Sequence, residues 1–110
     1  MKKLPTRLLK TMELGMKIRR PYKPKEEMFA IVREMSGGSR MKAFCEDGLT
    51  RMVRIPGRLK KKLWCRVNDI IIIKLWTVQA NTKCDLVYRY RPSEREVLKR
   101  KRLIPKNLII

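Results

Sequence analysis

The amino-acid sequence predicts an all-β protein, a five-stranded barrel with a short helix between strands three and four and a further helix near the C-terminal end. Three observations lead to this expectation. The chain has 110 residues, the usual length of one small domain. Five segments carry the alternating or continuous apolar pattern of strands, and turn-forming residues separate most of them. One short segment with helical spacing lies between the third and fourth of these strands.

The first three strands are predicted to form a meander, because tight turns join them. They span Met28–Met35, Arg40–Glu46 and Leu49–Ile55. The dipeptide Asp47-Gly48 favours a hairpin, since both residues tolerate positive φ. Alternation along the second strand puts Met41, Ala43 and Cys45 on one face and Arg40, Lys42 and Phe44 on the other.

The helix and the last two strands decide between barrel types. Arg58–Trp64 places Leu59 and Leu63 four residues apart, which favours about two helical turns with a basic outer face. Strands four and five are expected at Asp69–Trp76 and Cys84–Tyr90. An SH3-like barrel has the same number of strands. A helix between the third and fourth strands favours the OB-fold, a small Greek-key barrel that binds oligonucleotides.

Both ends of the chain are expected to be basic extensions of this domain, which spans residues 26–91. Residues 1–25 contain Pro5, Pro21 and Pro24 and are predicted to be mostly flexible. A C-terminal helix is predicted over residues 92–103, with Ser93 and Glu96 as a capping box, and a tail over residues 104–110.

Charge and composition restrict the function. The formal net charge is +19 and the chain has no histidine. Such an excess of positive charge favours a nucleic-acid partner, with an anionic membrane surface as the second possibility. The absence of histidine argues against Ser–His or Cys–His catalysis and most metal sites. Three cysteines without metal-ligand spacing are expected to be reduced, buried thiols. We therefore expect no enzyme, cofactor or metal.

Two groups of residues are candidates for RNA binding. The first is the basic helix and its surroundings: Arg58, Lys60, Lys61, Lys62, Trp64 and Arg66. The second is the outward face of the strands: Arg40, Lys42, Phe44, Arg51, Lys74 and Trp76. Cations that contact phosphates, with aromatic rings that stack on bases, are typical of single-strand binding. For the basic run the alternative is a solvated charged face, and Phe44 is equally well explained as a core residue.

An ordered series of residues over roughly positions 26–103 resembles translation initiation factor 1A in its archaeal form. The most specific pieces are Asp47-Gly48, Arg54–Leu59, Trp64, Trp76, Gln79, Lys83–Asp85 and Tyr88–Tyr90. The resemblance implies an OB-fold protein that sits in the aminoacyl site of the small ribosomal subunit, excludes elongator tRNA and helps to place initiator tRNA on mRNA. It also implies partnership with the subunit-joining GTPase. The implied ribosomal RNA contacts are Arg40, Lys42, Arg51, Arg54, Arg58, Lys60, Lys61, Lys62, Trp64 and Trp76.

Three alternatives or extensions remain open from the sequence. A general single-strand RNA-binding protein or RNA chaperone would use the same barrel without selectivity. Apolar residues near helical spacing in residues 1–20 would also suit a membrane-surface helix, although a flexible RNA-binding arm fits Pro5 and Glu13 better. The end Leu108-Ile109-Ile110 could dock on the GTPase, the alternative being that it frays or packs on its own barrel. We expect a cytoplasmic monomer.

Overall fold

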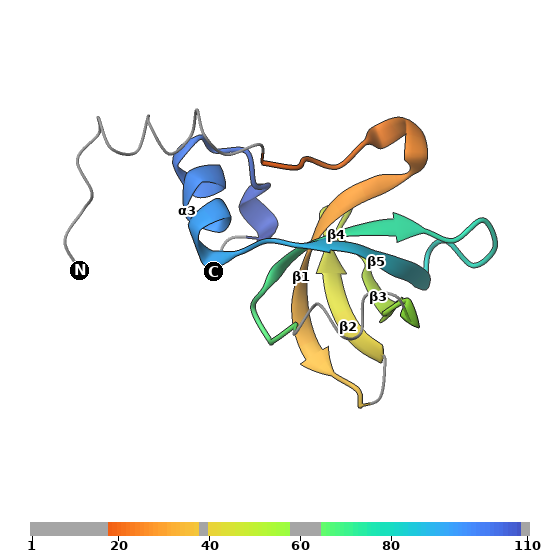
Figure 1. Ribbon diagram of the computed structural model, residues 1–110. Helices are drawn as coiled ribbons and strands as arrows, with labels where there is room; N and C mark the ends of the chain where they lie inside the picture. The colour runs from red at the N-terminus through yellow and green to blue at the C-terminus, as the bar shows by residue number, and fades with distance from the viewer. Residues whose placement is uncertain (1–17, 38–39, 58–64, 109–110) are drawn as a thin grey trace.

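The computed structural model describes residues 18–37, 40–57 and 65–108, and its central element is a closed five-stranded barrel (Figure 1). The strands are β1 (Glu27–Met35), β2 (Arg40–Cys45), β3 (Thr50–Arg54), β4 (Ile70–Leu75) and β5 (Lys83–Arg89). All five strand predictions are confirmed, and each end lies within one residue of its expected position.

The strand order β1-β2-β3-β5-β4 is that of the predicted OB-fold. Neighbouring strands pair antiparallel except β3 and β5, which are parallel. Register shifts between Val32 and Glu34 in β1 and between Ile72 and Ile73 in β4 mark irregularities in the ladder. Such bulges bend strands and help a short sheet to close. The predicted helix at Arg58–Trp64 lies outside the described residues.

The barrel interior is filled by alternate apolar residues of all five strands. The fully buried members include Ala30, Val32, Met41, Ala43, Cys45, Val53, Ile71, Ile73, Cys84 and Leu86. All three cysteines are free and buried, as expected from the sequence. Burial raises the pKa of the Cys65 thiol to about 11, so this thiol is protonated at neutral pH.

A second apolar cluster lies outside the barrel, between the sheet and the C-terminal elements. It joins Phe29, Ile31, Ile70, Ile72 and Tyr90 of the barrel to Leu98, Ile104 and Leu108. This arrangement explains the unbroken isoleucine run of β4. Ile71 and Ile73 face the interior, while Ile70 and Ile72 face the second cluster, so both faces of the strand are buried.

The C-terminal elements are α3 (Pro92–Arg100) and the 3-10 helix η2 (Lys106–Leu108). The helix ends at Arg100, three residues before the predicted end, and Arg102 then adopts a φ of 54°. The predicted capping by Ser93 and Glu96 is wrong. The helix begins at Pro92, as expected, but its N-cap is Arg91 and not Ser93. The carboxylate of Glu94 accepts a hydrogen bond from the Arg91 N–H at 2.9 Å.

Residues 18–25, the last part of the arm that is expected to be mostly flexible, contact the barrel. They include the 3-10 helix η1 (Lys23–Lys25). Buried Glu27 accepts hydrogen bonds from the Tyr22 N–H at 3.0 Å and from Arg19 Nη2 at 3.3 Å. The Tyr90 hydroxyl donates to the Arg19 carbonyl. The prediction of flexibility for residues 1–17 lies outside the described residues.

The C-terminal helix and the loop between β4 and β5 lie on different sides of the barrel. Figure 1 shows α3 on one side of the barrel, whereas the loop between β4 and β5 projects on the opposite side. No helix within the described residues is long and apolar enough to cross a membrane.

Candidate nucleic-acid interface

A row of polar side chains crosses the outer face of four strands. The β2–β3 register places Arg40 beside Arg54. The parallel pairing of β3 with β5 places Arg54 beside Asp85, and the β4–β5 register places Lys74 on the other side of Asp85. Arg40, Arg54 and Lys74 are exposed. The row therefore presents three cations and one half-buried carboxylate to solvent.

Asp85 organises the centre of this row. Its Oδ1 accepts hydrogen bonds from Arg54 Nε at 3.0 Å and from Trp76 Nε1 at 2.9 Å. Its Oδ2 accepts a second bond from Arg54 Nη2 at 3.1 Å, so the guanidinium is held at two points. Arg54 Cζ lies 5.4 Å from the centroid of the Trp76 ring, within cation–π range. One carboxylate thus fixes both the arginine and the tryptophan.

A shallow hollow of about 440 Å³ opens beside this group. It is lined by Arg54, Lys74, Leu75, Trp76, Thr77, Val78 and Asp85. Val78 is the most exposed large apolar side chain of the described residues, at 72%. An indole edge, an exposed aliphatic side chain and two cations around one hollow suit an unstacked base with its phosphates.

A second outward row extends the positive surface. The register places Lys42 beside Met52, and Met52 beside Lys83. Lys42 is about half exposed, and its Nζ lies 4.0 Å from a carboxylate oxygen of Glu34, the limit of an ion pair. A surface pair at this distance contributes little to stability and leaves the lysine available to a phosphate.

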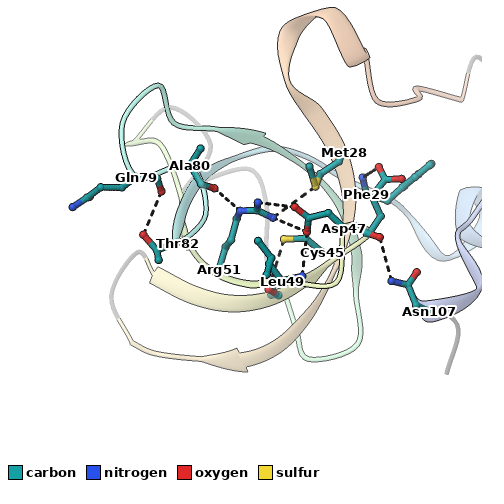
Figure 2. Close-up of polar contacts among 12 residues, drawn as sticks. Met28, Phe29, Cys45, Asp47, Leu49, Arg51, Gln79, Ala80, Thr82 and Asn107 are labelled. Carbon is teal, nitrogen blue, oxygen red and sulfur yellow. Dashed lines mark hydrogen bonds and ion pairs between the residues drawn. The ribbon is translucent and has the colours of Figure 1, made fainter.

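The expectation that Arg51 points outward is wrong, because its side chain is only 2% exposed. Arg51 pairs with Ala43 across the ladder and shares its inward face. Figure 2 shows the guanidinium directed at Asp47 and at the β4–β5 loop. Arg51 Nη1 and Nη2 donate to the two Asp47 oxygens at 2.9 and 2.7 Å, and Nε donates to the Ala80 carbonyl at 2.6 Å.

Arg51 is therefore a structural residue that connects the β2–β3 hairpin to the loop that follows Trp76. The guanidinium beside Asp47 lowers the pKa of that carboxyl below its usual range. The paired charges cannot turn toward an RNA without breaking these hydrogen bonds. Arg51 consequently acts on the candidate interface only through the position of the loop.

Phe44 has the outward position that alternation predicted, but the C-terminal elements shield that face. It is half-buried against the second cluster, and Arg33 Cζ lies 6.0 Å from its ring centroid. Of the two explanations open from the sequence, the core explanation fits this environment. Arg66 is exposed, in the loop before β4.

The remaining candidates fall into two groups. Arg58, Lys60, Lys61, Lys62, Trp64, Ile109 and Ile110 lie outside the described residues. Leu108 is 1% exposed and belongs to the second cluster, which fits the alternative that the tail packs on its own barrel. The tail folds back because apolar burial on its own barrel covers this side chain. Asn107 Nδ2 also donates to the Glu46 carbonyl at 3.2 Å, which anchors the same turn (Figure 2).

Sequence reasoning missed Asp85, Lys83 and Val78 as members of this surface. The signal available for Asp85 was alternation, which puts it on the face opposite to Cys84 and Leu86. The parallel β3–β5 pairing that brings Asp85 to Arg54 is a long-range contact without a local pattern. Val78 gave no signal beyond an apolar residue in a polar turn.

Comparison with known proteins gives a consistent result. The model of the family "Translation initiation factor 1A / IF-1" matches residues 17–110. A translation initiation factor 1A of Thermoplasma acidophilum is 47% identical over 85 residues, covering 77% of this chain and 71% of that protein. That of Methanococcus aeolicus is 42% identical over 85 residues, covering 77% of this chain and 81% of the relative.

A solved structure, that of a translation initiation factor from the Wolbachia endosymbiont of Brugia malayi, is similar with a TM-score of 0.48 and 10% identity. The match covers 69% of this chain and 85% of that chain. The barrel type of this chain is assigned from its strand order and not from this weak similarity.

Proposed function

Because this chain belongs to the translation initiation factor 1A / IF-1 family, we propose that it binds the small ribosomal subunit at the aminoacyl site through ribosomal RNA. In that position it excludes elongator tRNA and promotes the placement of initiator tRNA on mRNA. The observation that supports this most directly is the cationic row from Arg40 to Lys74, with Trp76 hydrogen-bonded to Asp85 beside it. It is a surface suited to RNA, on a chain with a net charge of +19.

The proposed contacts divide by chemistry. Arg40 and Lys74, exposed at the two ends of the row, neutralise phosphates. Trp76 offers part of its ring to a base, while its N–H is already satisfied by Asp85. Arg54 is held by Asp85 before RNA arrives, so less side-chain entropy is lost on binding. The factor acts by occupying the site, and the proposal includes no chemical step.

The basic run Arg58, Lys60, Lys61 and Lys62, with Trp64, remains part of the proposal as a second set of RNA contacts. So do Lys42 and Arg66. The partnership with the subunit-joining GTPase and with the initiator tRNA complex also remains a proposal. It no longer includes Leu108, which is buried in the second cluster.

The test is binding of the full chain to purified archaeal small subunits at near-physiological salt, with excess unrelated RNA as competitor. We expect saturation at one molecule per subunit that survives the competitor. The double variant Arg40→Gln/Lys74→Gln should weaken binding and reduce the slope of log K against log salt by about two, one for each lost phosphate contact. Lys106→Gln removes one positive charge near the C-terminal end and serves as the control.

The alternative function is a general single-strand RNA-binding protein or RNA chaperone. It is distinguished by stoichiometry and competition rather than by affinity. Binding of several molecules per subunit, removed by unrelated RNA, would favour the chaperone and refute the proposed site. A loss of binding in Lys106→Gln that is half of the loss in the double variant, and so equal for each charge removed, would show that only total charge matters.

A further inference from the structure

Asp85 keeps an unused hydrogen-bonding position in the hollow beside Trp76. Of the seven described residues that line this hollow, Asp85 is the only acid. Its two carboxylate oxygens can together accept about four hydrogen bonds. Oδ1 accepts two, from Arg54 Nε and Trp76 Nε1, and Oδ2 accepts one, from Arg54 Nη2. Since no further donor of the described residues is bonded to Asp85, one position on Oδ2 is open.

This open position lies beside the ring on which a base would stack. The carboxylate is joined to the edge of the indole through Trp76 Nε1. Asp85 is 29% exposed and lines the same hollow as Trp76 and Val78. A base that stacks on the indole therefore brings the polar groups of its own edge within reach of the carboxylate.

A phosphate does not suit this position. A carboxylate oxygen repels the oxygens of a phosphate, and the charge of Arg54 is already paired with Asp85. Lys74, exposed beside Asp85, is the cation that a phosphate reaches instead. Glu27, opposite Lys74 in the β1–β4 register, is buried and paired with Arg19. The open position must therefore be matched by a donor of the nucleotide.

Only an acceptor can discriminate between bases at this hollow. The side chains of Arg54 and Lys74 are donors, and every base carries an acceptor for them. The Thr77 hydroxyl can donate or accept, so it suits any base. The exocyclic amino group of cytosine donates, whereas uracil has a carbonyl oxygen in the same place. That carbonyl oxygen would face the carboxylate of Asp85 and be repelled.

We propose that Asp85 is a specificity-determining residue of the RNA interface. The open position on Oδ2 accepts a hydrogen bond from the exocyclic amino group of a base in the hollow, so the site prefers cytosine, adenine or guanine over uracil. This inference rests on the proposed function, since it requires single-stranded RNA at the hollow. It adds selection between bases, which phosphate contacts do not supply.

The test compares the tetranucleotides of cytidine and uridine on the full chain at about 100 mM salt. The two have the same phosphates and sugars, so a difference in affinity reports the base. Nitrogen-15 NMR follows the Trp76 Nε1–H signal, which is identified by its loss in Trp76→Phe. We expect the cytidine oligomer to bind about fivefold more tightly. An oligomer of pyrimidin-2-one, which is cytosine without its amino group, should bind as weakly as the uridine oligomer.

Two variants separate base selection from overall affinity. In Asp85→Asn the amide oxygen takes the position of Oδ1, at which two donors point, and the amide NH2 group replaces Oδ2. This variant should lose or reverse the preference for cytidine. The matched control, Arg40→Gln, removes an exposed cation at the other end of the row and should weaken both oligomers equally, with the same preference as wild type.

The outcomes distinguish this inference from the proposed function. Equal binding of the cytidine and uridine oligomers to wild type, with both weakened by Arg40→Gln, would overturn the inference and leave the RNA interface standing. An unchanged preference in Asp85→Asn would show that Asp85 only positions Trp76 and Arg54. If deoxyribose oligomers lose more affinity for wild type than for Asp85→Asn, without any difference between bases, the carboxylate accepts from the ribose 2′-hydroxyl and the inference is wrong. The absence of any shift at Trp76 would refute both.

Discussion

Replacing Arg51 by methionine should destabilise the fold more than any substitution on the RNA surface itself. The change keeps an unbranched side chain of similar length but removes the guanidinium that joins Asp47 to the Ala80 carbonyl. The Ala80 carbonyl and the Asp47 carboxylate both lose their donor. The loop before β5 would then be held to β3 by the ladder between β3 and β5 and by the hydrogen bond from the Met52 N–H to the Thr82 carbonyl, without a link to the hairpin through Arg51.

The magnitude lies between two limits. Removing one member of a fully buried ion pair costs about 3–5 kcal/mol, because the other charge is left uncompensated. Asp47 is 33% exposed, so water can hydrate the freed carboxylate, which lowers the cost. Hydrogen bonds to charged groups contribute about 1.5–3 kcal/mol. We therefore expect a loss of about 2–3 kcal/mol in the free energy of unfolding.

Urea unfolding of the full chain, followed by circular dichroism from pH 3 to pH 8, measures this effect. Arg51 lowers the pKa of Asp47 in the folded state, so the pair stabilises the fold above the unfolded pKa of about 3.9. This stabilisation is lost as the pH falls through the lower folded pKa. The difference between wild type and Arg51→Met should thus be constant from pH 6 to pH 8 and shrink below about pH 4.

The matched control is Arg54→Met, which removes an exposed arginine from its pair with Asp85. Surface pairs contribute about 0–1 kcal/mol, so this variant should unfold almost like wild type. Arg51→Met unfolding within 0.5 kcal/mol of wild type would refute the structural role of Arg51. A difference between wild type and Arg51→Met that does not change with pH would refute the assignment of the effect to Asp47.

Three more measurements test other parts of the molecule. Leu108→Ala should lower the free energy of unfolding by about 2–3 kcal/mol in urea titrations, since the side chain is buried; a loss under 0.5 kcal/mol would mean that the tail does not close the second cluster. Trp76→Phe keeps a ring but loses the bond to Asp85, so labelled oligouridine should bind it more tightly than Trp76→Leu by fluorescence anisotropy; equal affinities would exclude stacking. Cys65 and Cys84 should react with a thiol reagent at pH 8 far more slowly in the native chain than in urea, because burial raises both pKa values; similar rates would contradict their burial.

The strands were predictable from sequence because their signal is local. Alternation and hairpin residues fix where a strand begins, where it ends and which face is apolar, without knowledge of the partner strand. Arg51 shows how that signal was misapplied. It shares its parity with Leu49, Val53 and Ile55, so alternation alone placed it on the apolar face, and only its charge argued for the surface.

The outer face of the barrel was less predictable, because its surroundings depend on contacts distant in sequence. Phe44 is shielded by elements that follow it by more than fifty residues. Leu108 lies in the same apolar cluster as Phe29 and Ile31 of the first strand, although more than seventy residues separate them in the sequence. The isoleucine run did carry the necessary information, since a strand without alternation is buried on both faces, and that requires a layer outside the barrel.

The acidic residues explain how so basic a chain folds and still presents a positive surface. Six of its ten carboxylates, Glu27, Glu46, Asp47, Asp69, Asp85 and Glu94, accept hydrogen bonds that join segments of the described chain. Each neutralises a cation or satisfies an N–H or hydroxyl at a junction, where repulsion or an unpaired donor would otherwise destabilise the fold. Because the carboxylates are used at these junctions, the exposed Arg40 and Lys74 keep their charge for a phosphate. The strength and the salt dependence of RNA binding therefore follow from where the acids lie as much as from the number of cations.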